Sequence, residues 1–267
     1  MAQVLMHEPR PIDPGRQIDW GRTSIDYAAH RPGPPARLYN LLAALGIGVA
    51  GQRVLDLGTG TGLLACEFAR RGCGVSGTDI SPEQIAAARR AAASAGLNIH
   101  FQVAPAEVGP FADASFDVIT ASQCWMYFDP VRTIAEVKRL LAPGGVLATT
   151  HFSWLPERDP VARASEALVL KFNPAWQGAA WDGNVPHTPQ WSQHRAQVRA
   201  MFWFDHAVQF TVESWCGRMR ACRGVGATLS AADVAHFDAE HRELLARIAP
   251  PSFSIWHRVD AHVFEPL

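Results

Sequence analysis

Two acidic residues flank a glycine-rich segment whose composition suits ligand binding. Asp56 precedes Gly58, Gly60 and Gly62, which alternate with other residues, and Asp79 follows later in the chain. Glycines lack a side chain and therefore let a ligand approach the backbone closely. An acidic residue beside them repels a pyrophosphate and attracts the cationic end of a ligand. The segment predicts a binding turn for a molecule that carries a positive charge.

The glycine spacing differs from that of two common nucleotide-binding loops. A P-loop ends in Lys followed by Ser or Thr, and no Lys follows these glycines. A dinucleotide-binding turn has the pattern G-x-G-x-x-G, whereas residues 58–62 have G-x-G-x-G. A tight turn without a ligand stays an alternative. Asp79 ends a second predicted strand, and the residue at this position in related sheets binds ribose hydroxyls. Alternatively, Asp79 caps the next helix, although Ser81 is already suited to that role.

Short apolar segments alternate with helical segments around this turn. We expect strands at residues 53–57, 74–79, 99–103, 116–121 and 146–151, and helices at 61–71, 81–95 and 130–141. The later part of the chain adds a helix at 161–172, strands at 201–210 and 255–265, and a helical insertion between these two strands. Such alternation implies βαβ units with right-handed crossovers, and hence a doubly wound, mostly parallel sheet. Ligands of such sheets bind at the carboxyl ends of the strands.

The composition excludes several classes of protein. The 267 residues are 48% hydrophobic, which is enough apolar material for a folded core. The net charge of −1 provides no global basic field for a nucleic-acid backbone. The five cysteines have no paired or zinc-ligand spacing and indicate reduced thiols of the cytoplasm. The first residues do not resemble a signal peptide, and no segment is apolar for long enough to span a membrane. We accordingly expect a cytoplasmic protein without a metal, nucleic-acid or membrane partner.

Four sequence runs occur together in one known family. They are VLDLGTGTGLLA, VSGTDIS, FADASFDVITA and EVKRLLAPGGVLATT, in this order within residues 51–152. On these runs the chain resembles the class I S-adenosylmethionine-dependent methyltransferases, in particular the small-molecule group with a type 11 methyltransferase domain. The resemblance implies an α/β, Rossmann-like, doubly wound sheet of seven mostly parallel strands, with an antiparallel last strand and helical insertions that form a substrate cap. It also implies S-adenosylmethionine as cofactor and S-adenosylhomocysteine as product.

The resemblance divides the chain into three parts. Residues 1–50 would form an N-terminal helical lid, residues 51–152 the cofactor-binding core, and residues 153–267 the rest of the sheet with substrate-binding insertions. Tyr27 and Arg31, four residues apart in an expected helix, would close over the cofactor, with Arg31 at its carboxylate. A packed Tyr and a surface Arg are the alternative. The complete set of expected cofactor contacts is Tyr27, Arg31, Asp56, Gly58, Thr59, Gly60, Gly62, Asp79, Ile80, Ala106, Glu107, Ser122 and Gln123.

Individual roles within this set also follow from the resemblance. Asp56 would hold the cationic amino group of the cofactor, Asp79 its ribose hydroxyls, and Ile80 its adenine. The family usually has an Asp that binds the adenine amino group where this chain has Pro105. Glu107 or a backbone carbonyl would have to replace that contact.

Methyl transfer from a sulfonium depends more on position than on catalytic groups. The acceptor must lie in line with the methyl group, in a site that excludes water. A base is needed only for an acceptor that still carries a proton. His151, at the end of the fifth strand, is the best candidate for this base because a histidine titrates near neutral pH. A strand-end histidine that is bonded to the backbone is the alternative.

The acceptor pocket is expected in residues 153–267, which hold seven of the nine tryptophans. Tryptophans near loop starts suggest an aromatic wall for a planar or apolar acceptor, and core packing is the alternative. We expect Trp125 and Trp154 to contact the acceptor. Arg220 and Arg223 would share a helix face and bind a carboxylate or phosphate on it. A solvated helix face is the alternative for these two arginines.

The leading function is transfer of a methyl group to an O, N or C atom of an unidentified small molecule. A module that binds S-adenosylmethionine without turnover is an alternative that Pro105 suggests. A nucleic-acid methyltransferase is another, although residues 122–125 read Ser-Gln-Cys-Trp instead of Asn/Asp-Pro-Pro-aromatic. The glycine spacing and Asp56 disfavour a nicotinamide-dependent oxidoreductase. The expected partner is the small-molecule methyl acceptor, and a homodimer remains open.

Overall fold

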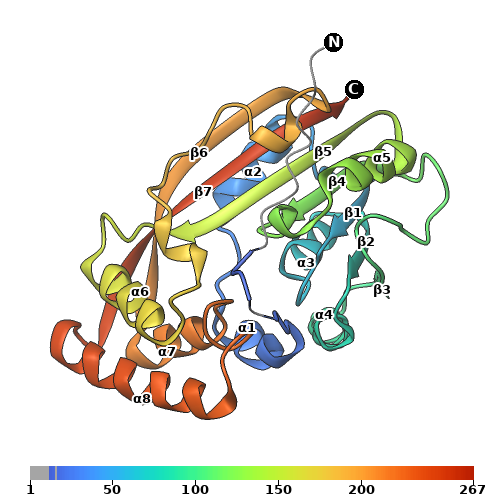
Figure 1. Cartoon of the computed structure of the whole chain (residues 1–267). Coiled ribbons are helices and arrows are strands. Elements are labelled where there is room, and N and C mark those ends of the chain that lie inside the picture. Colours follow the sequence, from blue (N-terminus) through green and yellow to red (C-terminus); the bar gives the residue numbers. More distant parts are fainter. Residues whose placement is uncertain (1–11, 16) are drawn as a thin grey trace.

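Seven strands form one mixed sheet in the order β3-β2-β1-β4-β5-β7-β6 (Figure 1). The computed structural model describes residues 12–15 and 17–267. The expectation about a signal peptide concerns residues 1–17, of which 1–11 and 16 lie outside the described ones. Five strands are parallel: β1 (Arg53–Leu57), β2 (Gly74–Asp79), β3 (Ile99–Val103), β4 (Phe116–Ser122) and β5 (Leu141–Trp154). The last strand, β7 (Ser252–Pro266), runs antiparallel to β5 and to β6 (Ala196–Thr211). The predicted Rossmann-like sheet with an antiparallel last strand is therefore confirmed.

Three helices connect the parallel strands: α3 (Leu63–Arg70), α4 (Pro82–Ser94) and α5 (Pro130–Leu140). The Ser81 hydroxyl caps α4 by accepting a hydrogen bond from the Gln84 amide, and a proline occupies the first position of that helix. Leu64 and Phe68 of α3 are buried in one core with Val54 of β1. This packing fixes the glycine-rich turn at the carboxyl end of β1.

Strands β5, β6 and β7 are longer than the sequence pattern predicts. The apolar run predicts a strand at 146–151, but β5 covers 141–154, and β6 covers 196–211 instead of 201–210. Residues 152–154 of β5 and both ends of β6 pair with β7 through the backbone, as far as Trp154 opposite His257. At the start of β5, Leu141 pairs with Phe116 of β4. Backbone pairing therefore continues where the apolar pattern has ended. As a result, β5 crosses the expected boundary at residue 152 without a break.

Four helices gather beyond the carboxyl end of β5 (Figure 1): α1 (Ser24–His30), α6 (Pro160–Phe172), α7 (Val212–Arg220) and α8 (Ala231–Ile248). Helix α1 packs against α7, and α8 packs against both α6 and α7. We call these four helices the helical cap. Apolar side chains of α6, α7 and α8 form a core with Trp154 of β5, in which Trp215 and Phe237 are fully buried. Outside the helical cap, α2 (Ala36–Ala44) precedes β1 in the chain and packs near β7. None of the helices in the described residues is both long and apolar enough to span a bilayer.

Candidate active site

The glycine-rich turn links β1 to α3 at the carboxyl edge of the sheet. Gly58 and Gly60 have positive φ angles of 59° and 56°, which residues with side chains rarely adopt. A Cβ atom at Gly58 would lie 2.8 Å from Cys124 Sγ, which is a collision. A Cβ atom at Gly60 would meet nothing closer than Gln84 Oε1, at 4.0 Å. The backbone is therefore closely packed at Gly58, and open space lies above Gly60.

Asp56 is buried at the end of β1, with 2% of its surface exposed. The hydroxyls of Thr59 and Thr120 donate hydrogen bonds of 2.7 Å to its two carboxylate oxygens. Burial raises the pKa of Asp56 to about 6, although these two hydrogen bonds lower it, and the nearby charge of Asp79 raises it further. A carboxylate held in this way favours a cation close to the turn.

Asp79 ends β2 and faces the same turn. Its two carboxylate oxygens accept hydrogen bonds of 2.9 Å from the backbone amides of Gly60 and Ser81. Burial raises the pKa of Asp79 in spite of these hydrogen bonds. Because each carboxylate oxygen has two lone pairs, Asp79 can also accept hydrogen bonds from the hydroxyls of a ligand.

A small cavity of about 30 Å³ lies against this turn. Its walls come from the turn, the end of β4 and the N-terminal segment: Tyr27, Arg31, Pro32, Pro34, Asp56, Gly58, Thr59, Leu63, Leu64, Ser122 and Phe152. Around the turn, the buried atoms Thr61 Oγ1, Thr78 Oγ1 and Gln84 Oε1 have no hydrogen-bond partner among the described residues. Buried polar atoms are normally hydrogen-bonded, so these three atoms, which lie outside the walls of the small cavity, are available to a water molecule or a ligand at the turn.

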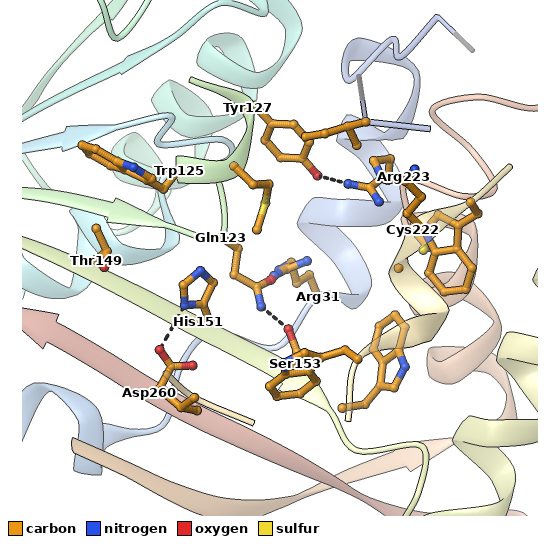
Figure 2. Close-up of a pocket in the computed structure, with 18 of the residues that line it drawn as sticks. Arg31, Gln123, Trp125, Tyr127, Thr149, His151, Ser153, Cys222, Arg223 and Asp260 are labelled. Atoms are coloured by element: carbon orange, nitrogen blue, oxygen red, sulfur yellow. Dashed lines mark hydrogen bonds and ion pairs between the residues drawn. The ribbon is translucent and has the colours of Figure 1, made fainter. Parts of the chain in front are cut away.

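A second cavity, of about 590 Å³, lies between the sheet and the helical cap. Much of its wall is aromatic, with Trp20, Trp125, Trp154, Trp176, Trp181 and Trp191. Polar side chains reach into it from β5, β7 and the segment after β4, namely Gln123, Thr149, His151, Ser153, Asp260 and His262 (Figure 2). Tyr27 and Arg31 border both cavities. The volume falls within the range of about 300–1,000 Å³ that is typical of small-molecule sites.

His151 and Asp260 face each other across the neighbouring strands β5 and β7. His151 Nδ1 lies 3.0 Å from Asp260 Oδ1 (Figure 2). Burial acts to raise the pKa of Asp260, but the hydrogen bond from His151 and the nearby imidazole of His262, 3.7 Å away, hold that pKa below its usual value. An ionised Asp260 fixes Nδ1 of His151 as the N–H donor, which leaves Nε2 as the proton acceptor. Because the His151 side chain is 31% exposed and borders the large cavity, this nitrogen is accessible.

Residues 55–149 match the family model described as a methyltransferase domain. The matched residues run from β1 into β5 and so lie within the Rossmann-like sheet. This similarity implies S-adenosylmethionine as a cofactor, for which the open space above Gly60 and the carboxylates of Asp56 and Asp79 are suited.

The curated relatives of this chain match about half of it. The demethylmenaquinone methyltransferase of Thermus thermophilus is 35% identical over 141 residues, which are 52% of this chain and 56% of that protein. The ubiquinone/menaquinone biosynthesis C-methyltransferase UbiE of Vibrio vulnificus is 34% identical over 162 residues, 58% of this chain and 55% of that protein. The chain thus spans about half the length of the curated relatives it matches. The crystal structure of the YcgJ protein from Bacillus subtilis covers 86% of this chain and 98% of its own, with a TM-score of 0.51 and 22% identity, and shares the fold.

The structure groups the expected cofactor contacts unevenly. Eight of the thirteen lie in the turn or border the small cavity. Asp79 faces the turn from β2, Gln123 borders the large cavity, and three residues lie elsewhere. Ile80 is 64% exposed beside Asp79, Ala106 is buried in the core, and Glu107 Oε1 accepts a hydrogen bond of 2.9 Å from the Asp129 amide. These three residues border neither of the two cavities, so their contact with adenine stays a prediction.

Tyr27 and Arg31 come together in a way that differs from the expected helix. Helix α1 ends at His30, and Arg31 has an extended backbone because the following Pro32 disfavours a helical conformation. The prediction that Arg31 belongs to the helix is therefore wrong. Its guanidinium carbon nevertheless lies 4.8 Å from the centre of the Tyr27 ring, so the two side chains stack beside both cavities.

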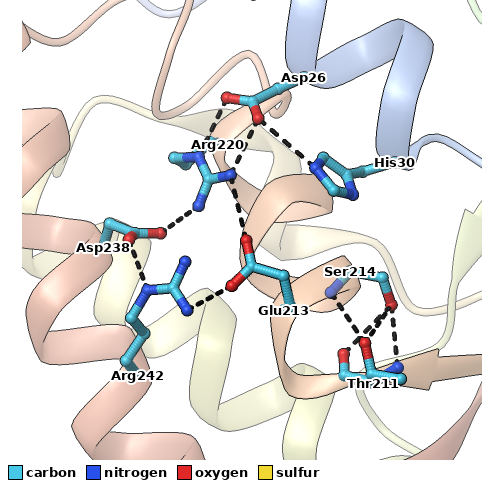
Figure 3. Close-up of polar contacts among 8 residues, drawn as sticks. All are labelled: Asp26, His30, Thr211, Glu213, Ser214, Arg220, Asp238 and Arg242. Atoms are coloured by element: carbon cyan, nitrogen blue, oxygen red, sulfur yellow. Dashed lines mark hydrogen bonds and ion pairs between the residues drawn. The ribbon is translucent and has the colours of Figure 1, made fainter.

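Arg220 does not reach the large cavity, and the prediction that it binds the acceptor is wrong. Its guanidinium donates hydrogen bonds to Asp26 of α1 and Asp238 of α8, on the side of α7 that faces these helices (Figure 3). Arg223 does border the cavity, but Asp13 lies 2.7 Å from its Nε and the Tyr127 hydroxyl 3.0 Å from its Nη1. Its charge is therefore already balanced by a buried carboxylate.

Trp125 and Trp154 border the large cavity, so the structure brings both to the place where acceptor contact was expected. Two charged residues of that cavity, Glu166 and Asp260, were not expected from the sequence. Arg218 borders it as well, whereas the sequence indicated only that Arg218 forms a cationic cluster with Arg220 and Arg223. Asp260 lies beside His151 only because β7 pairs with β5, and this pairing cannot be read from the local sequence pattern. Glu166 and Arg218 lie on α6 and α7, and the pattern of apolar residues gave no reason to place either inside.

Proposed function

We propose that this protein transfers a methyl group from S-adenosylmethionine to a small-molecule acceptor held in the 590 Å³ cavity. The adjacency of the two cavities carries the proposal, since Tyr27 and Arg31 border both of them. Ser122, at the end of β4, borders the small cavity, and its neighbour Gln123 borders the large one. A methyl donor at the glycine turn would therefore lie beside the acceptor, as an in-line transfer requires.

The turn residues would hold the cofactor by charge and hydrogen bonds. S-Adenosylmethionine, when bound, supplies a methyl group activated by a sulfonium charge. The Asp56 carboxylate favours the cationic amino acid end, and Asp79 accepts hydrogen bonds from the ribose hydroxyls. Arg31, which borders the small cavity, is the side chain suited to the cofactor carboxylate.

His151 is the base in this proposal, and Asp260 orients it. Asp260 accepts the Nδ1–H hydrogen bond, so Nε2 is the nitrogen that takes a proton from an acceptor hydroxyl or amine. The buried carboxylate also stabilises the imidazolium that forms. The proton then leaves to solvent, to which His151 is partly exposed.

The walls of the cavity favour a planar acceptor. Six tryptophans border it, and aromatic rings pack well against a flat ring. The same apolar walls keep water from the site and so favour neutralisation of the sulfonium charge during transfer. Two relatives are named for methylation in quinone biosynthesis, which is consistent with a ring as acceptor.

Methyl transfer to a panel of acceptors tests the proposal. The purified full chain is incubated with S-adenosylmethionine carrying a deuterated methyl group and with hydroxyaryl, aminoaryl and quinol compounds, and products are identified by mass spectrometry. We expect a labelled product with wild type, a rate at least about 100-fold lower with His151→Ala, and an unchanged rate with Arg242→Met, which changes an arginine outside both cavities. Binding of S-adenosylhomocysteine without transfer to any acceptor would instead support the non-catalytic module, and absence of that binding would contradict the proposal.

A further inference from the structure

Arg218 is a buried arginine that borders the large cavity. It lies on α7, and only 4% of its surface is exposed. Its guanidinium carbon lies 4.6 Å from the centre of the Trp154 ring, which also borders the cavity. Stacking on Trp154 holds the planar group in one orientation and leaves its N–H donors to the cavity side.

The charge of Arg218 has no acidic partner among the described residues. No carboxylate lies within ion-pair distance of its guanidinium, in contrast to Arg220 and Arg223 on either side of the same helix end. Burial, together with the positive charge of Arg31, lowers the pKa of Arg218 to about 9. Arg218 is thus a cation at neutral pH, and its environment disfavours that charge.

The two carboxyl groups that border the same cavity interact with residues other than Arg218. Asp260 interacts with His151 and His262. Glu166 accepts a hydrogen bond of 2.6 Å from the Trp154 indole nitrogen, and burial raises its pKa to about 7. Glu166 is therefore only partly ionised near neutral pH, and its carboxyl group is hydrogen-bonded to the ring on which Arg218 stacks. It does not supply a full negative charge to balance Arg218.

An uncompensated buried cation is costly to a fold, and burial of an unpaired charge is rare outside functional sites. The arginine would gain its counter-charge from a ligand that enters the cavity with an anionic group. Arg31 borders both cavities and, beside the glycine turn, is suited to the cofactor carboxylate, whereas Arg218 borders only the large cavity. The anion that Arg218 fits therefore belongs to the acceptor.

We propose that Arg218 is a specificity-determining residue which binds a carboxylate on an aromatic methyl acceptor. The planar guanidinium matches a carboxylate through two parallel hydrogen bonds, while the aromatic wall binds the ring. This inference rests on the proposed function, because it assigns the large cavity to the acceptor. It gives the acceptor a chemical class: an aromatic acid, with the methylated atom directed toward His151.

A matched pair of probes tests this assignment. The full chain is saturated with S-adenosylhomocysteine, and the dissociation constants of 6-hydroxy-2-naphthoate and of its methyl ester are measured by calorimetry. The two probes share the ring and the hydroxyl and differ in the charge. We expect the wild-type protein to bind the carboxylate about tenfold or more tightly than the ester. Arg218→Met should bring the two dissociation constants together, and Arg218→Lys should restore part of the difference.

Controls separate a local effect from misfolding. Arg242→Met removes an exposed, paired arginine of α8 and should keep the full preference for the carboxylate. Binding of S-adenosylhomocysteine to Arg218→Met should be unchanged, and its thermal unfolding should remain cooperative. If Arg218→Met does not fold, Arg218→Lys carries the test through its intermediate ratio.

Three results would overturn the inference: equal binding of acid and ester by the wild type, no binding of either probe, or a loss of S-adenosylhomocysteine affinity in Arg218→Met. The last result would show that Arg218 binds the cofactor carboxylate. The proposed function fails separately, if the wild-type protein does not bind S-adenosylhomocysteine at all. Binding of the cofactor product without any preference for the acid would contradict only the role of Arg218.

Discussion

Asp56→Asn should stabilise the protein without ligand and at the same time weaken its affinity for S-adenosylmethionine. Burial places the pKa of Asp56 at about 6, compared with an ordinary value of 3.8. This difference corresponds to about 3 kcal/mol of unfolding free energy at a pH where Asp56 is ionised in both the folded and the unfolded state. Asparagine keeps the size of the side chain and removes the charge, so the variant should recover part of this free energy.

The stability contributed by Asp56 falls as the pH rises. Near pH 3 the carboxyl is largely protonated in the folded and unfolded chains, so it contributes little. Between about pH 4 and pH 6 only the unfolded chain has ionised, and the folded state becomes less stable with increasing pH. With the pKa values above, about 1 kcal/mol of this loss lies between pH 5 and pH 7.5. The loss should be absent in Asp56→Asn.

Urea unfolding at pH 5 and pH 7.5 measures this difference, and calorimetry measures the affinity for the cofactor. Asp117→Asn is the control, because Arg53 holds the pKa of Asp117 below its usual value, and the Asp117 contribution does not change in this pH range. We expect the stability of Asp56→Asn relative to wild type to grow with pH, and its S-adenosylmethionine affinity to fall at least about tenfold. An identical pH dependence in both proteins, or an unchanged affinity, would refute the role of Asp56 as a buried carboxylate for a cation.

The other predictions concern the remaining parts of the site. Gly60→Ala should weaken S-adenosylhomocysteine binding, because its Cβ enters the open space above the turn, and should cost about 1–2 kcal/mol of stability at φ 56°; calorimetry and unfolding measure these two effects. Asp260→Asn should lower kcat roughly 100-fold with little change in cofactor affinity, because His151 loses the carboxylate that orients it; steady-state kinetics and calorimetry measure these two effects. Arg218→Met should raise the thermal midpoint, whereas Arg220→Met should lower it, because Arg220 would leave Asp26 and Asp238 without their partner; equal shifts in both variants would contradict the difference in charge pairing.

The first part of the fold could be predicted because its signals are local. The strands at 53–57, 74–79 and 99–103 have the predicted bounds, and Ser81 caps its helix as expected. In each case the apolar run and the turn residue next to it specify the same element. The glycine turn could be located for the same reason, since a strand, the glycines and a helix follow directly along the chain.

The acceptor side of the site depends on contacts between distant residues, and there the sequence was less informative. Helical periodicity placed Arg220 and Arg223 on one helix face, but this prediction is wrong, because α7 ends at Arg220 and Arg223 lies in the turn that follows. Only the packing of α7 against α1 and α8 directs Arg220 toward Asp26. Arg218 borders the cavity instead. No feature of the local sequence distinguishes Arg218 from Arg220 in this respect. Asp260 becomes the partner of His151 because β7 pairs with β5, although the two residues are 109 positions apart in the chain. Such partners are fixed by the register of the sheet, which the sequence pattern alone does not determine.

The central claim is that the turn after β1 binds the sulfonium cofactor and its product beside the large cavity. Isothermal titration calorimetry of the full chain with S-adenosylhomocysteine, and separately with NADH, tests this claim most directly. We predict binding of S-adenosylhomocysteine at one site per chain, with its affinity reduced in Gly60→Ala, and no binding of NADH. Binding of NADH without binding of S-adenosylhomocysteine would contradict the claim.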